Sequence, residues 1–204
     1  MINNSSKILC IVAHPDDEVL GLGGTLIKHN LSGDSVEIVF LSDGEGSKNN
    51  NINKNRLNNA KKCSKIIGST IYKIYDFPDQ KLDTVPKIEI IQSIEEILYK
   101  VKPDILYTHH VGDINHDHQI VSHAVLTALR PLNKSMANTE IRFFETPSST
   151  EQSPNIEQYL FKPNFYVSIK KEWDIKRKAL EAYSNELGVF PHPRSIKSIE
   201  ALAI

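Results

Sequence analysis

Two stretches of the sequence are rich in side chains that bind metals or transfer protons. The first, AHPDDEVLGLGGT over residues 13–25, contains His14, Asp16, Asp17 and Glu18. The second, THHVGDINHDHQIVSH over residues 108–123, holds five of the eight histidines: His109, His110, His116, His118 and His123. Histidine and carboxylate groups are common zinc ligands, so the two stretches together favour a metal site. In the second stretch, we expect the ligand to lie in the sequence NHDH.

Simpler explanations account for only part of the first stretch. Its three acids could stabilise a helix dipole by about 0.3–1 kcal/mol each, with Pro15 as the first helical residue. That explanation leaves His14 without a role. The glycines at 21, 23 and 24 lack the G-x-G-x-x-G spacing of a dinucleotide site and follow the acids, which argues against an NAD-dependent oxidoreductase. We expect them to permit close packing of a helix.

The elements that must position these stretches alternate between apolar runs and helical patterns. Strands are predicted at 7–13, 36–42, 71–75 and 104–109, and helices at 18–30, 54–67, 86–100 and 117–129. This alternation predicts a Rossmann-like α/β fold, in which helices cover both faces of a mostly parallel sheet. Each of the two stretches directly follows a predicted strand, so both should meet at the carboxyl ends of the sheet.

The remainder of the chain is less regular. We predict later strands at 140–146 and 164–169, an amphipathic helix at 171–183, an irregular PHPRS segment at 191–195 and an Asn-rich surface loop at 47–55. No linker divides the chain, so residues 1–204 are expected to form one domain.

Composition excludes several classes of partner. The 24 Lys and Arg residues balance 25 Asp and Glu residues, so no strong field attracts nucleic acid or anionic lipid. The apolar run near the start is too short for a signal peptide or a membrane span, which predicts a cytoplasmic protein without membrane insertion. Cys10 and Cys63 are expected to be buried free thiols in a reducing compartment.

A site with two histidines and one aspartate has a specific chemistry. Three protein ligands leave a fourth position for water, as in catalytic zinc sites. With a single carboxylate ligand the ion keeps net positive charge, lowers the pKa of bound water to about 7 and polarises a carbonyl group. A spare carboxylate beside the ligands then serves as general base. Other divalent transition metals also suit such a ligand set.

The pairing of AHPDDEVLGLGGT with GDINHDH resembles the PIG-L/LmbE family of zinc-dependent N-deacetylases. LSDGEGS, DFPDQKLDT, AVLTALRP, FFETPSST and PHPRS are similar to a bacterial branch of that family linked to surface-sugar synthesis. The resemblance implies removal of an acetyl group from a small N-acetylated, GlcNAc-like sugar, free or linked to a nucleotide or lipid.

The resemblance also implies roles for individual residues. The implied zinc ligands are His14, Asp17 and His118. Asp16 is the implied general base that takes a proton from the zinc-bound water, and Asp113 and Asp117 are the implied groups that orient the ligands.

One position departs from the family pattern. Many members have a histidine three positions before the third ligand, and this chain has Asn115 there. An amide can donate a hydrogen bond to an oxyanion but cannot deliver a proton. The proton for the leaving amine therefore comes from Asp16, which we favour, or from His192, which we expect near the substrate. His116 is expected to point outward.

Other expectations concern the substrate and the alternative function. Arg56 and Arg194 are candidates for binding anionic substrate groups such as a diphosphate, although Arg56 could equally be a solvated surface charge. Relatives continue past Ile204, so we expect a short C-terminal segment to be missing. That early end and Asn115 favour an alternative, a degenerate member that binds a metal or ligand without turnover. The free carboxylate of Asp16 favours the hydrolase over this alternative. The sequence also allows the protein to form a homo-oligomer.

Overall fold

The computed structural model describes residues 5–46, 55–130 and 138–203. Five parallel strands form one sheet in the order β3-β2-β1-β4-β5. Their bounds are β1 Lys7–Val12, β2 Ser35–Phe40, β3 Thr70–Ile74, β4 Ile105–His109 and β5 Glu140–Phe144. The predicted parallel α/β fold is therefore confirmed.

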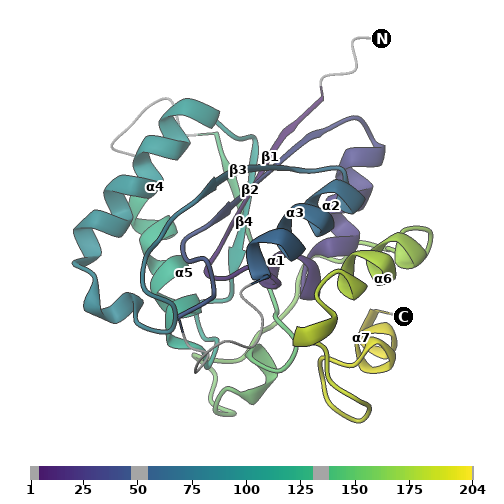
Figure 1. Cartoon of the computed structure of the whole chain (residues 1–204). Helices are drawn as coiled ribbons and strands as arrows, with labels where there is room; N and C mark the ends of the chain where they lie inside the picture. The colour runs from purple at the N-terminus through teal and green to yellow at the C-terminus, as the bar shows by residue number, and fades with distance from the viewer. Residues whose placement is uncertain (1–4, 47–54, 131–137, 204) are drawn as a thin grey trace.

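Helices cover both faces of this sheet, as Figure 1 shows. One face carries α4 (Lys87–Val101) and α5 (His116–Ala128), and the other carries α2 (Gly23–Leu31), α3 (Arg56–Ile67) and α6 (Trp173–Glu181). The shorter helices are α1 (Asp17–Leu20) and α7 (Ile196–Ala203), with 3-10 turns at Leu82–Thr84, Thr150–Gln152 and Ser184–Glu186.

The continuous apolar run of β1 reflects burial on both sides. Ile8, Cys10 and Val12 pack in the core beneath α2, α3 and α6. Leu9 and Ile11 alternate with them and pack in the core beneath α4 and α5. The central strand thus contributes to two apolar layers and is fixed firmly between them.

The strand order reverses direction at β1. The chain runs from β1 outward through β2 to β3, then returns to the other side of β1 with β4 and β5. In parallel sheets, ligands bind outside the carboxyl ends of the strands at such a switch point. His14 lies just beyond the end of β1 and His109 ends β4, so both predicted stretches meet at this crevice.

The predicted helix at 18–30 is wrong as a single element. It is broken into α1 and α2 at Gly21 and Leu22. A Cβ atom on Gly21 would lie 2.2 Å from the backbone oxygen of Glu145, so the glycine allows the turn between α1 and α2 to approach the segment after β5. The expectation that these glycines serve close packing is supported at this position.

The predicted strand at 164–169 is also wrong, because residues 161–169 have no regular secondary structure. This segment packs against α2 and joins no strand. Ile169 lies where a side chain on Gly24 would be, the Nζ of Lys28 donates to the backbone oxygen of Ser168, and Phe165 stacks under Arg142. Tertiary contacts therefore override a local strand pattern.

Other expectations have mixed outcomes. Residues 191–195 are irregular as predicted, and α7, which follows them, was not predicted. Cys10 and Cys63 are buried and free. Most of the Asn-rich stretch at 47–55 lies outside the described residues. In the part of the chain that the structure describes, no helix is long and apolar enough to cross a membrane.

Candidate metal centre

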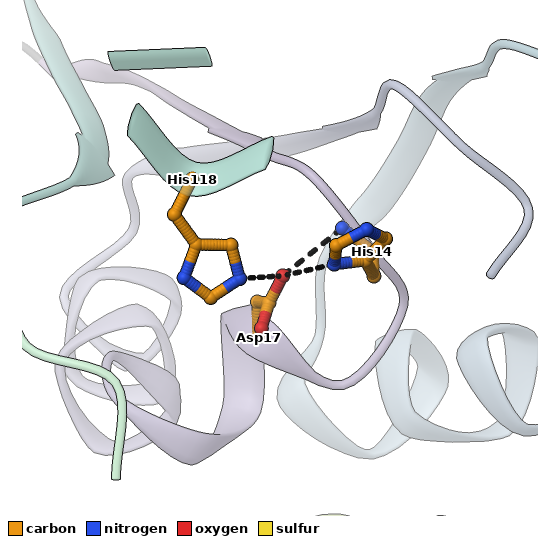
Figure 2. Close-up of side chains that lie close together, drawn as sticks. All are labelled: His14, Asp17 and His118. Carbon is orange, nitrogen blue, oxygen red and sulfur yellow. Dashed lines mark hydrogen bonds and ion pairs between the residues drawn. The ribbon is translucent and has the colours of Figure 1, made fainter. Parts of the chain in front are cut away.

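Three side chains at the switch point bring their ligand atoms together. His14 follows β1, Asp17 is the first residue of α1, and His118 lies in the first turn of α5. One potential ligand atom from each lies within 4.8 Å of the others. The three residues are 3%, 1% and 1% exposed, respectively. They are the three ligands that the sequence predicts, and Figure 2 shows both rings facing the carboxylate.

The Oδ2 atom of Asp17 is the centre of this group. It lies 3.4 Å from Nδ1 of His14 and 3.3 Å from Nε2 of His118, and it accepts the backbone N–H of His14 at 3.0 Å. Burial alone would raise the pKa of Asp17, but the adjacent His118 holds it well below its usual value. Asp17 is therefore an ionised carboxylate, as a metal ligand must be.

The far side of the His14 ring faces two other carboxylates. Its Nε2 lies 2.9 Å from Oδ2 of Asp117 and 3.2 Å from Oδ1 of Asp79. Asp117 is itself fixed, because it accepts backbone N–H groups from Gln80 at 2.8 Å and Leu82 at 3.1 Å. With Nε2 directed at these acids, Nδ1 is the His14 nitrogen left for a metal.

His118 is held in the same manner from the opposite direction. Its Nδ1 lies 3.3 Å from Oδ2 of Asp113. Asp113 accepts hydrogen bonds from Thr150 Oγ1 at 2.6 Å, from Ser149 Oγ and from the backbone N–H of Asn115 at 2.8 Å. This leaves Nε2 of His118 directed at Asp17. Both predicted orienting carboxylates, Asp113 and Asp117, thus lie behind the histidines.

The donor set fits a zinc-type ion. Neither ring nitrogen of His118 makes a well-aligned hydrogen bond within the described part of the chain. Burial disfavours charge on both rings, yet the surrounding carboxylates outweigh it and raise the pKa of His14 to about 10 and of His118 to about 9. The cluster therefore favours positive charge, which a divalent cation would supply in place of protons.

Asp16 lies next to this group but faces other partners. Its Oδ2 accepts from Nη2 of Arg56 at 2.9 Å and from Nη1 of Arg194 at 3.2 Å. Its backbone has φ of 120°, a strained value of the kind that clusters at functional sites. Burial raises the pKa of Asp16 above its usual value, and the two arginines act in the opposite direction.

The two predicted substrate-binding arginines therefore meet at Asp16. Arg56 also donates from Nη1 to the backbone oxygen of Gly44 at 2.8 Å and from Nη2 to Glu186 at 3.3 Å. The Nε of Arg194 donates to Ser148 Oγ. The alternative of a solvated Arg56 is wrong, since its side chain is 11% exposed.

Asn115 begins α5 as its N-cap. Its Oδ1 accepts the backbone N–H of Asp117 at 3.0 Å, so the amide NH₂ is the part of this side chain that could donate to a ligand. His192 is exposed, and its Nδ1 accepts the backbone N–H of Arg194 at 3.0 Å. The PHPRS segment thus reaches the site through Arg194, and His192 faces outward. His116 is exposed, as predicted.

Three buried residues beside the site lie outside the set of site residues that the sequence implied. The ring of His109 stacks on His118 with centroids 3.8 Å apart. Its Nε2 accepts the backbone N–H of Ala13 at 3.0 Å, and burial lowers its pKa to about 3, so it is a neutral packing group. Asp79 follows β3, where the strand-end rule could have found it. Glu18 is buried, accepts from Tyr183 at 2.7 Å and has its pKa raised by burial to about 7.

The fold and the site together define the class of this protein. It is a parallel α/β protein with a buried His and Asp cluster at the switch point of its sheet, and this cluster could hold a metal ion. The family model described as GlcNAc-PI de-N-acetylase, PIG-L, matches residues 9–129. The match spans more than half of the 204 residues. The chain belongs to the PIG-L family.

Individual relatives agree with this membership. Diacetylchitobiose deacetylase of Thermococcus kodakarensis is 27% identical over 201 residues, which cover 90% of this chain and 71% of that protein. The uncharacterized deacetylase YaiS of Escherichia coli is 27% identical, over 90% of this chain and 93% of YaiS. The crystal structure of the conserved protein TT1542 from Thermus thermophilus has a TM-score of 0.76 at 24% identity, over 97% of this chain and 86% of that one, and so shares its fold.

Proposed function

We propose that this chain is a zinc-dependent hydrolase that removes the acetyl group from a small N-acetylated, GlcNAc-like sugar, free or linked to a nucleotide or lipid. The family match and the deacetylase named in Thermococcus kodakarensis support this reaction class. A small substrate also agrees with the near-zero net charge, which gives no field for a polyanion.

One observation carries the proposal. Two histidines direct opposite nitrogens, Nδ1 of His14 and Nε2 of His118, at one oxygen of Asp17. A carboxylate stands behind each ring, which fixes its tautomer and raises its basicity as a ligand. A purely structural core would gain little from four buried ionisable partners around two rings.

His14, Asp17 and His118 would hold the zinc ion. When bound, it supplies a Lewis acid that lowers the pKa of water and polarises a carbonyl oxygen. Asp16, separate from the three ligands and buried, takes the proton from the attacking water. Because burial raises its pKa, Asp16 holds that proton more readily than an exposed aspartate and can return it to the leaving amine.

Asn115 would stabilise the oxyanion that forms at the amide carbon. Its oxygen is committed to the N-cap of α5, which orients the NH₂ group as a fixed donor. A preorganised donor of this kind needs no reorganisation during the reaction. Arg56 and Arg194 hold Asp16 in place and lie close enough to the site to meet an anionic group on the substrate.

Product analysis tests the proposed function. Zinc-loaded protein is incubated with a panel of N-acetyl sugars and nucleotide sugars, and acetate and primary amine are measured together. We expect equal amounts of both products, loss of turnover with a chelator and recovery with zinc. His118→Ala serves as the control without metal. Protein that binds one ion but releases neither product from any substrate would contradict the proposal and favour a binding function.

A further inference from the structure

A buried hydrogen-bonded chain connects α6 to the backbone of Asp16. The hydroxyl of Tyr183, just beyond α6, donates to Oε1 of Glu18 at 2.7 Å. The other oxygen of the same carboxylate, Oε2, accepts the backbone N–H of Asp16 at 2.9 Å. Tyr183 and Glu18 are each 1% exposed. Tyr183, which is 165 positions from Glu18 in the chain, therefore helps to hold the peptide that carries the proposed general base.

The backbone at Asp16 needs such support. Its φ of 120° is strained for a residue with a side chain, a state that persists only when its surroundings impose it. Its carbonyl oxygen already accepts from Val19 and Leu20 at the start of α1. Its N–H, as at any helix N-terminus, has no backbone carbonyl acceptor within the helix. Glu18 supplies that partner, and Tyr183 fixes the Glu18 carboxylate.

We propose that Glu18 and Tyr183 are positioning residues that set the orientation of Asp16 for proton transfer. This inference rests on the proposed function of Asp16 as general base. Among the described residues, no hydrogen bond or ion pair joins either side chain to His14, Asp17 or His118. Removal of the bond from Tyr183 should therefore affect proton transfer by Asp16 and leave metal binding intact.

A second buried tyrosine provides a matched control. Tyr107 is 4% exposed, and its hydroxyl bonds to His29 at 3.0 Å and Arg142 at 2.9 Å. These hydrogen bonds do not involve Asp16, Glu18 or Tyr183. Tyr107→Phe thus removes a similar buried hydroxyl without touching the chain from Tyr183 to Asp16, and separates positioning from a general loss of stability.

Steady-state kinetics, metal content and the amide resonance of Asp16 test the inference together. Tyr183→Phe should lower kcat by up to about 100-fold, the scale of a small misplacement, with KM within about twofold and one metal ion retained. Glu18→Ala should lower kcat further, and Glu18→Gln, which keeps an acceptor oxygen for the Asp16 N–H, should recover part of it. Tyr107→Phe should keep the wild-type kcat.

The amide proton of Asp16, followed by NMR with ¹⁵N-labelled aspartate, distinguishes failure of the inference from failure of the proposed function. It should shift in Tyr183→Phe and Glu18→Ala but not in Tyr107→Phe, whether or not the protein turns over any sugar. A folded Tyr183→Phe with wild-type kcat, or with an unmoved Asp16 amide resonance, would overturn the inference. If wild-type protein shows no turnover, the proposed function fails. The Asp16 amide resonance alone then tests whether Tyr183 and Glu18 position Asp16.

Discussion

The Oδ2 atom of Asp117 lies 2.9 Å from Nε2 of His14, although the two residues are 103 positions apart in the chain. The contact joins the first stretch, residues 13–25, to the second, residues 108–123, across the switch point of the sheet. It turns Nδ1 of His14 toward Asp17. The orientation of His14, the first proposed ligand, thus depends on a residue from the same helical turn as His118, the third proposed ligand.

Asp117→Asn should weaken metal binding. An asparagine loses the charge that makes His14 a better ligand, and such changes behind a metal ligand typically reduce affinity by about 10–100-fold. Competition with a chromophoric chelator would measure the change. Asp104→Asn, which alters an exposed carboxylate bonded to the backbone of Lys7, is the control. Equal affinities in both variants would show that Asp117 does not support the ligand.

Asn115→Ala should lower kcat by about 10²–10³ with little change in KM, the size found for loss of one oxyanion donor. The substitution also removes the N-cap of α5, at a cost of about 1 kcal/mol in stability. Asn115→Ser keeps a capping oxygen and removes the NH₂ group, so it should be stable but slow. A serine variant with wild-type kcat would exclude the oxyanion role.

His192→Ala should leave the alkaline limb of the pH–rate profile in place. His192 is exposed, and its Nδ1 is engaged by its own turn, whereas Asp16 lies beside the proposed metal ligands and needs no loop movement. The profile of kcat/KM against pH, measured for both proteins, checks this. Loss of the alkaline limb in His192→Ala would assign the general acid to the PHPRS segment.

Much of this architecture could be predicted from the sequence because its signals are local. The β1 run is apolar throughout since both of its faces are covered, and the alternation of strands with helices fixes a parallel sheet. His14 and His118 follow predicted strands, so the strand-end rule brings them together. The exposed position of His116 also agrees with its place between site residues in the motif.

The remainder depends on contacts that local sequence does not encode. Residues 164–169 have a strand pattern, yet the backbone of Gly24 leaves space for Ile169 against α2. The bond from Tyr183 to Glu18 and the meeting of Arg56 and Arg194 at Asp16 each join distant parts of the chain. No periodicity or motif spacing reports such pairings.

Lys176 should make the free energy of unfolding increase with pH in the alkaline range. It is buried, donates to the backbone oxygen of Leu20, and burial lowers its pKa from 10.5 to about 8. Between these values the unfolded chain binds more protons than the folded one, so the free energy of unfolding rises with pH. At about 1.4 kcal/mol per pKa unit, the full rise is about 3 kcal/mol.

Denaturant unfolding of wild type and Lys176→Met at several pH values from about 8 to 10.5, the range between the folded and unfolded pKa values, isolates this contribution. The methionine variant cannot titrate at this position. An increase with pH in the difference between the two free energies of unfolding is therefore due to Lys176. An identical pH dependence in both would show that folding does not lower the pKa of Lys176.

The adjacent residues Asp16 and Asp17 distinguish most directly between the proposed general base and the proposed metal ligand. Both are buried and one position apart, so Asp16→Asn and Asp17→Asn are matched changes. The measurement is bound metal per chain by elemental analysis, with amine release from the same samples. Asp17→Asn should lose the ion, whereas Asp16→Asn should keep one ion per chain and lose most turnover. Loss of the ion in Asp16→Asn with its retention in Asp17→Asn would show that Asp16 is the metal ligand and that the two roles are reversed.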